Sequence, residues 1–393
     1  MDQDWKIFNV STKESFIPKG GPESSFLKYK QGFLVRSITV PFASPQLEAH
    51  LQRLSSIPPA INNKGLLSLP NELLLYIAEP PGSGLCVEEV VMLAMTCQRL
   101  YELYRGLIDH YHICQAASWM MNRILCSGSH AKYEDLPAAL FKAQERALIE
   151  TKSKEGGASY GGLSDFCSDD TRLYRGAFTY KPEWLHTFKS AADRNVFKLI
   201  MAVTFPSRTD WVLCNHTKKE FVRASAIAEL AGKPNDDQPF LPRCKLDLGH
   251  ALLTRICWST EKPMDTPDSM KMHRGPWVGD RFYITTMDRR CMPSEGDDWE
   301  WKDVSGQVVR DLVRVYRMVF GKKDWLAKVE GQVSEEDWTQ YYWFASDGQD
   351  DLSSRFRDVP YPYIVRLAMC HYTNFGWNWE YDGPRPPIGY FEL

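Results

Sequence analysis

The chain has 393 residues, of which 44% are apolar and 13% aromatic, and its 47 basic and 50 acidic side chains give a net charge of −3. This length and composition suit two to three folded domains and exclude a wholly disordered protein. The balanced charge gives no electrostatic reason to expect binding to nucleic acid or to an anionic membrane.

Two further features of the sequence bear on its compartment. No stretch approaches the roughly 18 consecutive apolar residues of a transmembrane helix, and the opening MDQDWKIFNV lacks the basic-then-apolar pattern of a secretory signal. The ten cysteines include no C-x-x-C pair, which favours reduced, packed thiols over a disulfide framework or a zinc module. We therefore expect a soluble protein of the cytoplasm, the nucleus or both.

Residues 1–63 mix turn-forming residues with one short apolar run, Gly32–Arg36, which suggests a strand. The pair Pro58 and Pro59 stands shortly before the next segment. We interpret residues 1–63 as an N-terminal arm that is only partly ordered.

Residues 64–108 predict a small helical domain. Its first helix would have Pro70 in the first turn, where a proline sacrifices no hydrogen bond, and Ser68 as its cap. The prolines and glycines of Pro80–Gly84 must end it. One face of this helix carries three apolar side chains, Leu73, Leu74 and Ile77.

A second helix would begin near Glu88 and Glu89, whose carboxylates complement the positive end of the helix dipole. Its apolar face is formed at helical spacing by Val90, Leu93, Ala94 and Cys97. A third helix repeats that spacing at Leu100, Leu103, Tyr104 and Leu107. A unit of about 40 residues is marginally stable alone, so these apolar faces need a partner.

The residue order Leu69-Pro70-x-Glu72-Leu73-Leu74-x-x-Ile77, followed by Thr96-Cys97-x-Arg99-Leu100, resembles an F-box. The resemblance implies that the helices dock on the Skp adaptor and, through it, on the cullin of a ubiquitin ligase. It implies adaptor contacts at Leu69, Pro70, Leu73, Leu74, Ile77, Val90 and Leu93. The sequence departs from the family in its longer Glu79–Leu85 loop and in lacking a Trp near the end of the motif. The alternative is an ordinary helical hairpin with a Leu-Pro start.

Beyond this motif, Ile113–Leu125 and Leu136–Ile149 carry apolar residues at helical spacing. Residues 109–150 are therefore predicted to be a helical extension. Residues 151–175 contain a run rich in Gly, Ser, Lys and Asp, Lys152–Asp170, and are interpreted as a linker.

Residues 176–393 are richer in aromatic and strand-like segments. The apolar run Phe197–Phe205 predicts a buried strand, and Trp211–Cys214 with Glu220–Arg223 predicts a hairpin. Further expected elements are a strand with a turn over Trp277–Thr286, a helix over Gln307–Phe320 capped by Asp303 and ended by Gly321, and a helix starting at Ser334.

No repeat of roughly 20 to 50 residues occurs, which argues against a propeller or a solenoid. The expected fold class is α+β, with a three-helix F-box and helical extension followed by a mixed α+β domain over residues 176–393. Three stretches of that domain, DWVLCNHTKKEFVRA, LLTRICWS and HRGPWVGDRFYITT, are similar to the region after the F-box-like motif in many uncharacterised proteins of mushroom-forming fungi. This resemblance covers nearly all of the chain from the motif onward and implies no activity.

No nucleotide-binding, nucleophile-elbow or zinc-protease motif occurs, so we expect neither an enzyme nor a bound cofactor. The nearest approach to a metal site is His110-x-His112-x-Cys114. Its i, i+2, i+4 spacing scatters the side chains around a helix, and we expect no metal there.

Charged residues offer two weaker candidates for binding. His273 and Arg274 are interpreted as solvated turn residues, with an anion site as the alternative. Three arginines share one helix face, which is interpreted as solvated, with a docking patch as the alternative. These are Arg310, Arg314 and Arg317.

Trp377 and Trp379 lie between Gly376 and Gly383, and their i, i+2 spacing places both on one side of an extended segment. Core packing is the first interpretation, and a recognition surface is the alternative, because Trp is enriched at binding hot spots. With the F-box resemblance, these features predict a substrate receptor of a Skp-cullin-F-box ubiquitin ligase that recruits an unknown protein. The alternative is an F-box-like scaffold or a ligand-binding protein, for example one that binds glycans, outside any ligase.

Overall fold

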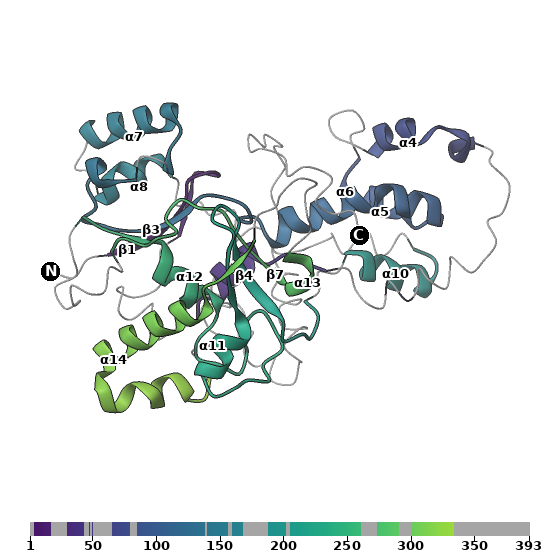
Figure 1. Ribbon diagram of the computed structural model, residues 1–393. Coiled ribbons are helices and arrows are strands. Elements are labelled where there is room, and N and C mark those ends of the chain that lie inside the picture. The colour runs from purple at the N-terminus through teal and green to yellow at the C-terminus, as the bar shows by residue number, and fades with distance from the viewer. Residues whose placement is uncertain are drawn as a thin grey trace, which may run out of the picture.

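The computed structural model describes residues 4–16, 30–42, 47, 49, 65–78, 85–137, 140–155, 159–167, 188–201, 205–260, 273–290 and 300–333. Within these ranges the fold is mixed α+β, with helices around two mixed sheets and neither a barrel nor a solenoid (Figure 1). The expected α+β class is confirmed at this level. In the same ranges, no helix combines the length and apolar character needed to cross a bilayer.

The first sheet has the strand order β2-β1-β3-β6 and unites three distant parts of the chain. Its strands are β1 (Trp5–Asn9), β2 (Glu14–Phe16), β3 (Ile124–Gly128) and β6 (Cys257–Trp258). β1 is antiparallel to β2 and β3, with Ile7 opposite both Phe16 and Cys126, whereas β6 is parallel to β3. Residues 1–63, interpreted above as an arm, therefore supply an inner strand of this sheet.

The second sheet has the order β7-β4-β5-β8. Its strands are β4 (Trp211–Asn215), β5 (Glu220–Arg223), β7 (Phe282–Thr286) and β8 (Lys302–Asp303). The expected hairpin is confirmed, because β4 and β5 pair antiparallel with Asn215 opposite Glu220. The strand expected over Trp277–Thr286 begins only at Phe282, since Gly279 turns the preceding backbone with a φ of 79°.

Four helices pack on these sheets: α2 (Gly32–Ile38), α11 (Ala224–Leu230), α12 (Leu248–Ile256) and α14 (Ser305–Glu330). The short α13 (Met287–Arg290) follows β7 directly. The strand expected at Gly32–Arg36 is wrong, because this segment forms α2 and buries Leu34, Val35 and Ile38 in the largest core. An apolar run this short fits the residue spacing of a strand as well as that of a helix. Packing against α12 decides in favour of the helix.

A buried lysine fixes the segment before α2. Lys30 is only 1% exposed, and its Nζ donates to the backbone oxygens of Phe240, at 2.8 Å, and Leu241. The backbone N–H of Gln31 donates to Oδ2 of Asp247 at 2.8 Å, at the start of α12. These bonds satisfy a charge that would be costly to bury alone, and they tie the N-terminal region to α12.

The helix expected over Leu136–Ile149 corresponds in part to α7 (Ala143–Glu155). The rest of the predicted helical extension and the predicted linker differ from the structure. Instead of a helix over Ile113–Leu125, the chain leaves a helix at Ala116 and enters β3. Downstream lie η2 (Tyr133–Asp135), α7 (Ala143–Glu155), η4 (Ser159–Gly162) and α8 (Leu163–Phe166). Leu163 and Cys167, within the predicted linker, are buried in a core that also contains Phe8 and Leu125, so the described part of that segment is packed.

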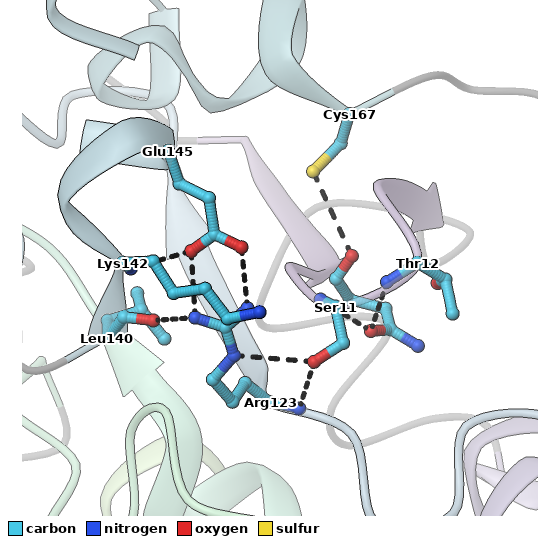
Figure 2. A network of polar contacts seen from close by, with 8 residues as sticks. Ser11, Thr12, Arg123, Leu140, Lys142, Glu145 and Cys167 are labelled. Carbon is cyan, nitrogen blue, oxygen red and sulfur yellow. Dashed lines mark hydrogen bonds and ion pairs between the residues drawn. The ribbon is translucent and has the colours of Figure 1, made fainter. Parts of the chain in front are cut away.

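Arg123 joins α7 to the N-terminal turn (Figure 2). Its Nη1 and Nη2 donate to the two carboxylate oxygens of Glu145 at 2.9 and 2.7 Å, and its Nε donates to Oγ of Ser11 at 3.3 Å. Burial alone would raise the pKa of Glu145, but its hydrogen bonds from Arg123 and the N–H of Lys142 hold it below the ordinary value. The pair fastens α7 to the start of β3.

A separate helical group contains η1 (Gly65–Ser68), α4 (Asn71–Ala78), α5 (Val87–Ala94), the N-terminal part of α6 (Gln98–Ala116) and α10 (Ala191–Met201). Figure 1 shows α6 running from this group toward the sheets. The buried strand expected at Phe197–Phe205 is wrong in its described part, because Phe197, Ile200 and Met201 belong to α10. Their i, i+3, i+4 spacing places them on one helical face, which packs in the helical core.

The expected long helix is confirmed and extended. α14 begins at Ser305, whose N–H donates to Oδ1 of Asp303 at 2.8 Å. Gly321, with φ of 78° and ψ of 164°, interrupts the helix as expected, but a second helical part continues to Glu330. Figure 1 shows the two parts of α14 at an angle.

Candidate adaptor-binding surface

The Leu-Pro step starts α4 without a side-chain cap from Ser68. The Ser68 hydroxyl donates backward to the carbonyl of Gly65 at 2.7 Å, so the expected cap is wrong. The carbonyl of Pro70 accepts the N–H of Leu74 at 3.1 Å, the first bond of the α-helical pattern. Pro70 thus stands immediately before the helix, where its missing N–H breaks no ladder.

Arg99 holds this start in place from the first turn of α6. Its Nη1 donates to the carbonyl of Leu67 at 2.7 Å, and its Nη2 donates to the carbonyl of Leu69 at 3.2 Å and to Oδ1 of Asn71 at 2.8 Å. One planar guanidinium therefore binds η1, the Leu-Pro step and the first residue of α4. The Thr96-Cys97-x-Arg99 part of the motif has a structural role in positioning the Leu-Pro part.

One face of α4 packs in the helical core. Leu74 and Ala78 are buried there, and the hydroxyl of Tyr104 on α6 donates to the carbonyl of Leu74 at 2.9 Å. Burial raises the pKa of Tyr104, so its hydroxyl remains a donor. Among the described residues, the helical core and Tyr104 therefore contact α4 on the side of Leu74 and Ala78.

Its other side exposes apolar surface. Tyr76 is 66% exposed, Leu73 is 50% exposed and Leu66 is 39% exposed. They are three of the six large apolar side chains that the described part of the chain exposes strongly. Pro70 is also exposed, and Leu69 and Ile77 are half-buried. The α4 stripe is defined as Leu66, Leu69, Pro70, Leu73, Tyr76 and Ile77.

The second helix is buried more deeply. Glu89 accepts the N–H of Cys86 at 2.8 Å and so starts α5. Val90 is only 5% exposed, Val91 is buried, and Leu93 is half-buried.

The structure thus divides the seven expected adaptor contacts. Four lie on the α4 stripe: Leu69, Pro70, Leu73 and Ile77. Leu74 and Val90 lie inside the helical core, and Leu93, like the half-buried Leu69 of the stripe, packs against its margin. The sequence interpretation missed Leu66 and Tyr76, although the i, i+3 spacing of Leu73 and Tyr76 is a signal for a shared face.

The charged residues named above as candidates for binding contact neighbouring side chains and backbone or lie exposed. The guanidinium of Arg274 lies 4.4 Å from the ring centroid of Trp258 and donates to the carbonyl of Asp135 at 3.3 Å. Arg314 pairs with Asp311 at 3.4 Å, and three arginines of α14 are exposed. These are Arg310, Arg314 and Arg317.

Trp377 and Trp379 lie outside the described residues, as does the helix expected from Ser334. No group of three or more His, Cys, Asp and Glu side chains gathers as a metal site in the described ranges. No family model, no curated protein and no solved structure matches this chain.

Proposed function

We propose that this protein is a substrate receptor of a Skp-cullin-F-box type ubiquitin ligase. The α4 stripe docks on the Skp adaptor, and a C-terminal part of the chain recruits the protein to be ubiquitinated. The protein itself is not an enzyme, and the chemistry belongs to other subunits. The observation that carries the proposal is the stripe of apolar side chains, because it coincides with the Leu-Pro motif and is held by Arg99.

The energetics of the stripe support a binding role. Fully burying one Leu or another large apolar side chain contributes about 1.5–3 kcal/mol relative to leaving it exposed. Leu73 and Tyr76 together leave a large part of that free energy unused in the isolated chain. A partner that covers both side chains gains it, and contiguous exposed apolar patches mark such interfaces.

The first test measures binding of the purified Skp adaptor to the full chain by titration calorimetry. Leu73→Ala with Tyr76→Ala should weaken binding at least about 100-fold, because hot-spot side chains contribute about 2 kcal/mol or more each. Leu148→Ala is the matched control, since Leu148 on α7 is 52% exposed and lies outside the motif. Equal affinities for the wild type and the double variant would reject the proposal.

A scaffold or ligand-binding protein outside a ligase is the second candidate. It is favoured by the burial of Val90 within a core that the chain completes with its own α10. Affinity purification of the tagged full chain distinguishes the candidates. Recovery of the adaptor and cullin supports the receptor, whereas recovery of the chain alone under gentle conditions supports the scaffold.

A further inference from the structure

α10 covers α5 from a distant part of the sequence. Its buried side chains, Phe197, Ile200 and Met201, belong to the same core as the buried side chains of α5. Phe188 extends this contact, with its ring centroid 5.2 Å from that of Phe197. Figure 1 shows α10 beside α5, with α4 and α10 on either side of α5 in this view.

α10 leaves one part of the expected adaptor-binding surface, the α4 stripe, open and covers the other part, α5. The α4 stripe remains open, with Leu73 and Tyr76 at least half exposed. On α5, by contrast, Val90 is buried and Leu93 is half-buried in the core that α10 completes. An adaptor that approaches the chain while α10 is packed on α5 can therefore reach the α4 stripe but cannot surround α5.

We propose that α10 is an autoinhibitory cover of the adaptor-binding surface, which moves away from α5 when the adaptor binds fully. This inference rests on the proposed function. Binding would then be a two-state equilibrium in which only the uncovered state engages both helices. The apparent dissociation constant is the intrinsic one divided by the uncovered fraction, so weakening the α10 contact tightens binding.

Hydrogen exchange on the unaltered full chain tests the movement directly. The probe is the purified Skp adaptor at a saturating concentration, and the readout is the protection of the backbone amides of residues 191–201. A displaced α10 loses protection on binding, because its helical hydrogen bonds open to water more often. Unchanged or increased protection of these amides in the complex would overturn the inference.

A variant pair gives an independent measurement. Phe197→Ala removes the most deeply buried ring of α10, whereas Asn195→Ala changes an exposed position on the same helix. The inference expects Phe197→Ala to bind the adaptor at least about tenfold more tightly than the wild type and Asn195→Ala to bind equally. Unfolding of each variant is followed by circular dichroism, and Phe197→Leu replaces Phe197→Ala if the latter does not fold.

The outcomes separate this inference from the proposed function. If the wild type binds the adaptor and loss of the Phe197 ring weakens or preserves that binding, α10 is a permanent fourth helix and only the autoinhibition fails. If neither the wild type nor the α10 variants bind the adaptor, the proposed function fails and the autoinhibition fails with it. Tighter binding by Phe197→Ala together with loss of α10 protection supports both.

Discussion

Arg99 is the residue on which the geometry of the Leu-Pro step depends. A lysine keeps the charge but cannot reach the carbonyls of Leu67 and Leu69 and the side chain of Asn71 together. Arg99→Lys should therefore lower the free energy of unfolding by about 1–2 kcal/mol and weaken adaptor binding several-fold. Urea unfolding and calorimetry measure the two effects.

The control for this change is Arg105→Lys on the same helix. Within the described part of the chain, Arg105 forms an i, i+4 ion pair with Asp109 at 3.7 Å, and such surface pairs contribute less than about 1 kcal/mol. It should leave both stability and affinity nearly unchanged. Equal effects of the two substitutions would show that Arg99 acts only through its charge.

His112, near the C-terminal end of α6, should make the free energy of unfolding depend on pH. Burial lowers the pKa of His112 to about 4, whereas an unfolded histidine titrates near 6.5. As the pH falls from about 6.5 toward 4, the unfolded chain gains a proton that the folded chain does not accept. The contribution of His112 to stability is thus present above pH 6.5 and falls by about 3 kcal/mol toward pH 4.

The pH effect is measured by urea unfolding of the wild type and His112→Gln between pH 7 and pH 4. The glutamine keeps a polar side chain and removes the titration. The wild type should lose about 3 kcal/mol more than the variant over this range, and parallel curves would contradict the assignment. Buried carboxylates such as Asp236, whose pKa is raised mainly by burial, are common to both proteins and cancel in the difference.

The sequence predicts single side chains of the candidate site unevenly. Pro70 and Leu73 were recognisable because a motif fixes their order along the chain. The order of residues in the motif does not decide which side chains of α4 point outward, however. Leu74 is buried, whereas Tyr76 is exposed. That choice depends on the rotation of α4 against α6, which the Tyr104 hydrogen bond helps to set.

At the scale of elements, local signals predict the β4–β5 hairpin but not the β1–β2 hairpin. The β4–β5 hairpin is predicted because two short β-rich runs flank a polar turn. The strand predicted at Phe197–Phe205 is wrong in its described part, because a continuous apolar run suits both a buried strand and a buried helix. The sequence does not predict the β1–β2 hairpin, because β2 has only three residues. It does not predict the β1–β3 pair, because β3 lies more than 100 residues away and nothing local specifies that pairing.

Two glycines of α14 provide an element-scale prediction. Gly321 has a φ of 78° and a ψ of 164°, a conformation open almost only to glycine. Gly306 lies in the first helical turn, where an added Cβ would make an ordinary contact with Nη1 of Arg310 at 3.7 Å. Gly306→Ala should stabilise the protein by about 0.4–1 kcal/mol. Gly321→Ala should destabilise it by about 1–3 kcal/mol. Urea unfolding measures both, and a stabilising Gly321→Ala would show that the bend between the two parts of α14 is not required.

At the scale of the whole molecule, distant segments complete each other's cores. The first sheet joins residues 5–16, 124–128 and 257–258, and the helical group joins residues 65–108 to α10. Lys30 and Gln31 add polar bonds from the N-terminal region to Phe240 and Asp247. The chain therefore has few places where it can be cut without separating packed partners.

This interleaving predicts the behaviour of residues 176–393 in isolation. A fragment of that range lacks β1, β3 and α2, so β6 loses its only described strand neighbour and the large core loses Leu34, Trp119 and Ile124. Because each large apolar side chain removed from a core costs about 2–5 kcal/mol, the loss exceeds the stability of an ordinary domain. The fragment should show no cooperative thermal transition and should bind an apolar dye, whereas the full chain should melt cooperatively. Co-expression with residues 1–175 is the control and should restore the transition. A cooperative melt of residues 176–393 alone would instead establish them as an independent domain, with residues 151–175 as the boundary.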